Sequence, residues 1–169
     1  MSSTKPLSGR SALITGASRG IGHAVAYEFA KQGADLFLLA RTVGGLEEIH
    51  DQIKTDFPEC NVTLIANDIT NFKEMEALGP ALASKIDELD IWVANAGMLS
   101  TMGPLAHGKF KEFQKVMDTN LTANYQLIRT LDPLLKILML GARFLLHQAL
   151  RKKAARIGEH IPSAKQRLK

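Results

Sequence analysis

The amino-acid sequence predicts an α/β fold in which a parallel sheet carries helices on both faces. Short apolar runs alternate with longer helical patterns along the first two thirds of the chain, and the runs return every 24 to 29 residues. Each run is apolar throughout, as expected of a strand that is covered on both faces. This βαβα order is typical of a doubly wound, Rossmann-like parallel sheet.

Four strands and four helices are predicted in alternation. The strands are the runs 12–15, 36–40, 62–66 and 91–94. The helices follow from apolar residues that recur at three- and four-residue spacing, and they cover 21–32, 46–56, 72–88 and 110–136. Gly33, Pro58 and the stretch 98–108 punctuate the helices.

Composition excludes several classes of protein. The chain has 169 residues, 46% apolar and 22% charged, which fits one globular domain and excludes a disordered or collagen-like chain. The longest hydrophobic stretch, 137–150, is interrupted by Arg143 and His147, so no run reaches the roughly 18 apolar residues of a membrane-spanning helix. Residues 1–10 lack the apolar core of a secretory signal, and a cytoplasmic protein is expected. The single cysteine, Cys60, can form neither an internal disulfide nor, alone, a zinc site, so no metal is expected.

The charges divide the chain in two. Residues 1–136 hold 13 Lys/Arg and 16 Asp/Glu, a net charge of −3, whereas residues 137–169 hold 8 Lys/Arg and one acid, a net charge of +7. We therefore predict a boundary at residue 136, between a domain over 1–136 and a basic tail of different character over 137–169. The tail is expected to form an amphipathic helix over 138–156.

A glycine-rich turn follows the first predicted strand and opens the first predicted helix. It reads Thr15-Gly16-Ala17-Ser18-Arg19-Gly20-Ile21-Gly22. Three glycines let the backbone turn sharply and approach a ligand, and the helix N-terminus offers free N–H groups to a pyrophosphate. The predicted cofactor-binding residues of this turn are Gly16, Ser18, Arg19, Gly20, Ile21 and Gly22. The alternative is a turn that only closes a strand-to-helix corner.

Three further motifs follow in order: Asn67-Asp68-Ile69 after the third run, Ala94-Asn95-Ala96-Gly97 after the fourth, and Asn120 inside the last helical pattern. With the glycine turn, they resemble the short-chain dehydrogenases/reductases over residues 8 to about 136. The resemblance implies cofactor contacts from the residues that match its second and third motifs, namely Asp68, Ile69, Asn95, Ala96 and Gly97. It also implies a catalytic role for Asn120, through a water of a proton relay. Two of these residues also have a purely structural alternative: Asp68 could cap a helix or a turn, and Asn95 could fix a turn through hydrogen bonds from its side chain to the backbone.

The end of the second predicted strand indicates which nicotinamide cofactor is bound. NAD sites usually place an acid there, but this chain has Ala40 followed by Arg41. A guanidinium suits a 2′-phosphate, and Arg19 could flank the same group. We predict NADP(H) in preference to NAD(H). The alternative is that Arg41 is a solvated loop residue.

The family's catalytic Ser and Tyr-x3-Lys have no counterpart in this reading frame. Tyr27 and Lys31 have the spacing but lie on the first predicted helix, and Tyr125 is followed at that offset by Arg129. Strand five is also absent, so the sheet is expected to end at 91–94 with an exposed edge. The resemblance thus implies a catalytically incomplete fragment: a partial NADP(H)-binding, Rossmann-like domain over 1–136, followed by an aberrant basic tail over 137–169.

A shift of reading frame is our hypothesis for the charge break at residue 136. If the third base of each codon is joined to the first two of the next, His147-Gln148 yields Ser or Pro, and His160-Ile161 yields Tyr or His. Ala164-Lys165 includes Lys among its options, four codons after that tyrosine. One offset therefore recovers all three missing residue types.

Three functions are compared. The favoured one is an NADP-dependent oxidoreductase of this family, catalytically incomplete, whose partners are the cofactor and a second copy of itself. The alternative is a non-enzymatic nucleotide-binding module whose basic tail contacts nucleic acid or an anionic membrane; nucleic acid is disfavoured, since a mistranslated tail has no selected role. The third is an enzyme with an unconventional proton donor such as His107 or His147.

Overall fold

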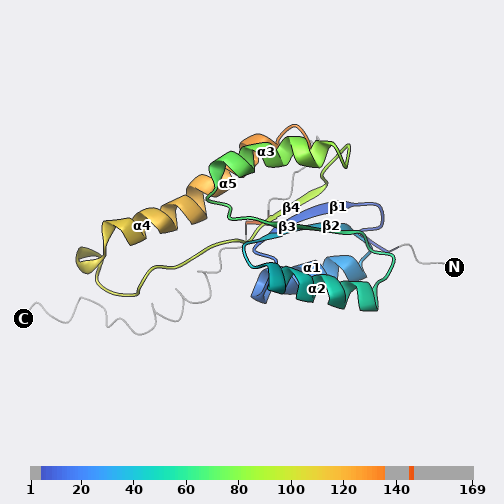
Figure 1. The fold of residues 1–169 in the computed structure, drawn as a ribbon, viewed down its shortest axis with the longest axis horizontal. Helices are drawn as coiled ribbons and strands as arrows, with labels where there is room; N and C mark the ends of the chain where they lie inside the picture. Colours follow the sequence, from blue (N-terminus) through green and yellow to red (C-terminus); the bar gives the residue numbers. More distant parts are fainter. Residues whose placement is uncertain (1–4, 136–144, 147–169) are drawn as a thin grey trace, which may run out of the picture.

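A computed structural model describes residues 5–135 and 145–146 of the chain. Its strands form one sheet in the order β3-β2-β1-β4-β5, and every neighbouring pair is parallel (Figure 1). The strands are β1 (Ser11–Thr15), β2 (Asp35–Ala40), β3 (Val62–Ala66), β4 (Ile91–Ala94) and β5 (Leu145–Leu146). The helices are α1 (Gly20–Lys31), α2 (Val43–Asp56), α3 (Phe72–Ala83), α4 (Phe110–Met117) and α5 (Ala123–Leu131).

Helices cover both faces of the sheet, as the apolar strands predicted. Ala12 and Ile14 of β1 point to a core shared with α1 and α2, whereas Leu13 between them points to a second core shared with α3 and α5. Successive residues of a strand face opposite sides, so an uninterrupted apolar run fills both cores. The predicted doubly wound, Rossmann-like fold is confirmed.

Two predicted helices end earlier or change character. α3 ends at Ala83 instead of residue 88, because the chain must turn there toward β4, and the Leu89 N–H donates to the Leu134 carbonyl at 2.7 Å. The long helix predicted over 110–136 consists of α4, a π-helical turn Asp118–Thr122, and α5, which ends at Leu131. Residue 136 lies outside the described residues.

α3 and α5 pack closely at a crossing that contains a proline. Pro80 lies inside α3 and has no N–H to donate to the carbonyl of Glu76, four residues earlier. The Thr130 hydroxyl of α5 donates to that carbonyl at 3.0 Å instead. The backbones can approach because residue 79 is glycine: a Cβ there would lie 2.2 Å from the Thr130 carbonyl oxygen. The interhelical bond therefore replaces one that α3 cannot make.

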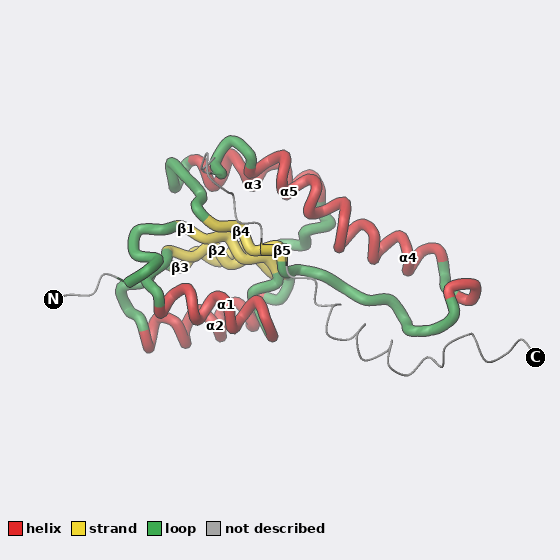
Figure 2. The backbone as a smooth tube through the Cα atoms, turned by 180° about the vertical axis from the view of Figure 1, so that it is seen from behind, coloured by secondary structure: helices red, strands yellow, loops and turns green. Residues whose placement is uncertain are grey.

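The edge of the sheet beyond β4 differs from the sequence prediction. The sheet was expected to end at 91–94, but Leu145 and Leu146 pair with Val93 and Ala94 as the short strand β5 (Figure 2). An unpaired strand edge is a ready template for backbone pairing, and the predicted exposed edge is corrected accordingly. The helix predicted over 138–156 is wrong at Leu145 and Leu146, which form this strand, and the rest of the predicted basic tail, 137–144 and 147–169, lies outside the described residues.

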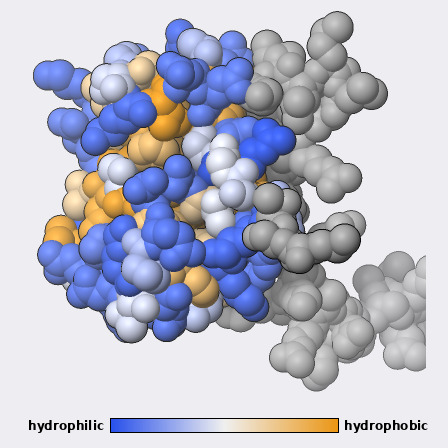
Figure 3. Space-filling model, turned by 90° about the vertical axis from the view of Figure 1, so that its right-hand side faces the viewer, coloured by the Kyte–Doolittle hydropathy of each residue, from blue (hydrophilic) through white to orange (hydrophobic). Residues whose placement is uncertain are grey.

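α4 buries none of its residues, unlike α1, α2, α3 and α5. It extends past the end of the sheet (Figure 1), and Phe110 and Phe113 expose 76% and 48% of their surface. Seen from the right-hand side of Figure 1, the coloured surface is mostly hydrophilic, with hydrophobic residues visible between the hydrophilic ones (Figure 3). Within the described part of the chain, no helix has the length and apolar character needed to cross a membrane.

Candidate functional site

The glycine turn between β1 and α1 forms the base of the site. Gly16 and Gly20 have φ values of +68° and +59°, which other residues adopt at a steric cost. Gly22 faces inward, and a Cβ there would lie 2.2 Å from the Gly16 carbonyl oxygen. Each glycine is thus required by backbone geometry, and Gly20 and Gly22 place no side chain at the start of α1.

Buried polar groups attach this turn to the end of β4. The Asn95 amide donates to the carbonyls of Thr15 and Gly16 at 3.0 and 3.2 Å. The buried Thr15 hydroxyl donates to the Val93 carbonyl and accepts from the backbone N–H groups of Asn95 and Ala96. Asn95 therefore does fix the glycine turn, as its alternative interpretation expected. It also lines the cavity.

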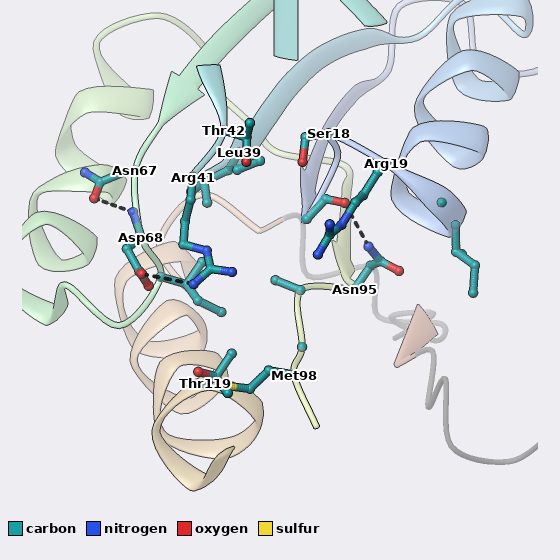
Figure 4. Close-up of a pocket in the computed structure, with 17 residues that line it drawn as sticks. Ser18, Arg19, Leu39, Arg41, Thr42, Asn67, Asp68, Asn95, Met98 and Thr119 are labelled. Carbon is teal, nitrogen blue, oxygen red and sulfur yellow. Dashed lines mark hydrogen bonds and ion pairs between the residues drawn. The ribbon is translucent and has the colours of Figure 1, made fainter. Parts of the chain in front are cut away.

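A cavity of about 520 Å³ opens above the glycine turn at the carboxyl ends of the strands (Figure 4). Open α/β sheets bind ligands at this edge, and the volume lies within the usual range for small-molecule sites. Eleven of the twelve predicted cofactor-binding residues line it; Gly22 packs behind Gly16 instead. Sequence reasoning missed six further lining residues, which are Leu39, Ala40, Thr42, Asn67, Met98 and Thr119. Most of them flank predicted residues at strand ends, which is the signal that could have found them.

The start of α1 presents positive potential to the cavity. Its first turn contains no acidic residue, and no side chain caps its N–H groups. Ser18, Arg19 and the half-exposed Ile21 surround it. A helix N-terminus with free N–H groups stabilises a bound anion.

Arg41 and Asp68 face each other at the wall of the cavity. The Arg41 Nη1 and Asp68 Oδ2 atoms are 3.7 Å apart, and the two side chains are 69% and 41% exposed. Burial alone would raise the pKa of Asp68, but hydrogen bonds from the Thr70 N–H and hydroxyl and the Arg41 charge hold that pKa below its usual value. The residue that caps the N-terminus of α3 is Asn71 and not Asp68. Asp68 instead closes a turn, through the hydrogen bonds that it accepts from Thr70.

Asn120 lies in the π-helical turn and does not line the cavity, although its neighbour Thr119 does. Its amide makes a two-way contact with the backbone of Met98: Oδ1 accepts from the N–H and Nδ2 donates to the carbonyl, both at 2.9 Å. The Asn124 amide donates to the Asn120 carbonyl at 2.9 Å. An asparagine is unfavourable inside a helix, and here it anchors the loop that borders the cavity.

The two tyrosines lie outside the cavity. The Tyr27 hydroxyl donates to Asp56 at 2.8 Å, and this hydrogen bond, then burial and the charge of Asp56, raise the pKa of the phenol. Tyr125 is exposed on α5, beside the Arg129 guanidinium. His107 lines a separate hollow of about 370 Å³, and His147 lies outside the described residues. No group of three or more His, Cys, Asp or Glu side chains in the described ranges could hold a metal ion.

Comparisons with known proteins agree with this geometry. A model of the short chain dehydrogenase family matches residues 10–142. The chain is 35% identical over 121 residues to the 3-oxoacyl-acyl-carrier-protein reductase FabG of Vibrio cholerae, which is 72% of this chain and 47% of that relative. It is 37% identical over 116 residues to the glycine betaine reductase ATRR of Emericella nidulans, 68% of this chain and 9% of that relative.

Solved structures give the same result. A metagenomic short-chain oxidoreductase crystallised in complex with NADP is 33% identical and superposes with a TM-score of 0.70, over 75% of this chain and 57% of the other. This chain therefore spans less than half the length of the two curated relatives and little more than half of that solved chain.

Proposed function

The chain belongs to the short chain dehydrogenase family, and on this premise we propose that residues 1–136 are the NADP(H)-binding, Rossmann-like part of an oxidoreductase. The reaction proposed is hydride transfer between NADP(H) and a carbonyl or alcohol substrate. The observation that carries the proposal is the glycine turn. It leaves the N-terminus of α1 uncapped, free of acids and open to a cavity large enough for a nucleotide.

The residues present suit a dinucleotide. The backbone N–H groups at the start of α1 would take the pyrophosphate, since a Cβ at Gly20 would meet nothing within 4 Å and the approach is open. When bound, the nicotinamide supplies or accepts the hydride. The residues proposed to hold the cofactor are Gly16, Ser18, Arg19, Gly20, Ile21, Gly22, Arg41, Asp68, Ile69, Asn95, Ala96 and Gly97.

The charges at the end of β2 favour NADP(H) over NAD(H). Arg41 and Arg19 line the cavity, and neither Ala40 nor Thr42 offers a carboxylate to ribose hydroxyls. The related metagenomic oxidoreductase was crystallised with NADP, which agrees with this choice.

The proton-transfer machinery is proposed to be incomplete in this chain. We propose that Asn120 holds the loop at Met98 in place and occupies the position of the family's relay asparagine, with no tyrosine at the cavity to which a proton could be relayed. Neither Tyr27 nor Tyr125 is near enough to the cavity to line it. We further propose that 137–169 is a basic tail produced by a shift of reading frame, and that the chain binds cofactor without turnover.

Titration with NADPH and NADH, followed by nicotinamide fluorescence, tests the proposal. We expect binding of NADPH to be tighter than that of NADH, and no NADPH oxidation with a panel of carbonyl compounds. Gly22→Ala should abolish binding because its Cβ would collide with the Gly16 carbonyl. Gly44→Ala is the matched control, since a Cβ there meets nothing within 4 Å. Equal or tighter NADH binding would overturn the cofactor choice, and steady turnover would overturn the incompleteness.

A further inference from the structure

The ion pair between Arg41 and Asp68 joins two neighbouring strand ends. Ala40 at the end of β2 pairs with Ala66 at the end of β3, so the residues that follow lie side by side at the carboxyl edge of the sheet. Both side chains line the cavity, and the guanidinium points at the carboxylate (Figure 4). The group proposed to recognise a 2′-phosphate therefore already has an anionic partner.

The two members of the pair differ in how firmly they are held. Asp68 Oδ1 accepts from the Thr70 N–H at 2.9 Å and from its hydroxyl at 2.7 Å, and the Asp68 N–H donates to the Asn67 side chain at 2.8 Å. Arg41 is the more exposed member, at 69%. Asp68 is thus a fixed anion, and its second oxygen, Oδ2, faces a side chain that has room to move.

We infer that Asp68 determines specificity through Arg41, by competing with a ribose phosphate for the guanidinium. A carboxylate and a phosphate both accept from the same N–H donors of an arginine, and a charge shared between two anions binds each less strongly. Asp68 thereby reduces the preference of the site for nucleotides that carry a 2′-phosphate. This inference rests on the proposed function, since it takes the cavity to hold an adenine nucleotide.

The test compares two nucleotides that differ only in the 2′-phosphate. Adenosine 2′,5′-bisphosphate and adenosine 5′-monophosphate are titrated calorimetrically into the full chain and into Asp68→Asn. The quantity compared is the affinity for the bisphosphate divided by the affinity for the monophosphate. Any contact of residue 68 with the adenine affects both affinities and cancels in this ratio. An asparagine oxygen at residue 68 can still accept from Thr70. The pair is exposed, so we expect the ratio to rise by about two- to five-fold in Asp68→Asn. Asp68→Ser is a second variant with the same expected direction, should the first not fold.

A double-mutant cycle separates the competition from other effects of the carboxylate. In an Arg41→Ala background, Asp68→Asn should leave the ratio unchanged, because the guanidinium is gone. Asp51→Asn, an exposed acid on α2, is the matched charge control and should leave the ratio at its wild-type value. An unchanged or lower ratio in Asp68→Asn means that Asp68 merely orients Arg41, and the same rise without Arg41 means direct repulsion; either result overturns the inference. If wild-type chain binds neither nucleotide, the proposed function fails and the inference falls with it.

Discussion

Replacing Thr130 by valine isolates the bond between α5 and α3. Valine keeps the shape of threonine but removes the hydroxyl that donates to the Glu76 carbonyl at 3.0 Å. A hydrogen bond of this kind contributes about 0.5–1.5 kcal/mol net, and Pro80 leaves this carbonyl without its helical donor. We expect Thr130→Val to lower the free energy of unfolding by about 1 kcal/mol, which at a urea m-value of roughly 2 kcal/mol/M shifts the midpoint by about 0.5 M.

The same substitution in a Pro80→Ala background tests the cause. Alanine at residue 80 supplies the backbone N–H that α3 lacks, so the Glu76 carbonyl keeps a donor when the Thr130 hydroxyl is removed. The cost of Thr130→Val should therefore fall toward zero. Urea unfolding followed by circular dichroism gives all four free energies of the cycle.

The control is Thr55→Val on α2. The Thr55 hydroxyl also donates to a helix carbonyl, that of Asp51 at 2.8 Å, but this carbonyl lies four residues before an ordinary backbone N–H. Its loss should change stability by less than about 0.5 kcal/mol. An equal cost of Thr130→Val with proline and with alanine at residue 80, within about 0.3 kcal/mol, would refute the idea that the hydroxyl replaces the missing donor.

Three further outcomes are expected. Asn120→Ala removes two bonds to the Met98 backbone, worth about 1–3 kcal/mol, and regains at most about 0.7 kcal/mol of helix propensity, so urea unfolding should show net destabilisation. Cys60 is buried, and burial raises the pKa of its thiol, so a disulfide reagent should label it far more slowly in buffer than in urea. The folded-state pKa of Asp68 is lowered, so its stabilisation is present above the unfolded pKa of about 3.9 and is lost as the pH falls through the folded value. Stability measured from pH 6 to about 2 should fall less in Asp68→Asn than in wild type, and an equal fall would contradict the assignment.

The sheet could be predicted because each of its first four strands is a short, continuous apolar run of neighbouring residues. The predicted runs 62–66 and 91–94 coincide with β3 and β4, and the other two strands begin one residue earlier than predicted. The glycine turn was equally readable, since positive φ at Gly16 and Gly20 admits few other residues. Both features depend on residues that are neighbours in the chain.

Contacts between residues far apart in the chain could not be predicted from the sequence. The sequence around Pro80 does not indicate that the hydroxyl of Thr130, fifty residues later, donates to the Glu76 carbonyl. The sequence of α3 therefore could not predict which donor replaces the N–H that Pro80 lacks. The fixing of Met98 by Asn120 is of the same kind, since the helical pattern around residue 120 predicts a continuous helix and not a π-helical turn. In the site, the residue types were found, but their partners required the tertiary structure.

The lack of buried residues in α4 has a consequence for local stability. α4 is the free end of a continuous helical run over 110–131 and has no core contacts to hold it, whereas α5 anchors Ala123, Leu127 and Leu131 in the core. Backbone amides of α4 should therefore exchange with deuterium through local opening, at rates nearly independent of dilute urea, while those of α5 exchange only as the domain unfolds. The π-helical turn that contains Asn120 would then mark the border between a segment that frays and one that unfolds with the core.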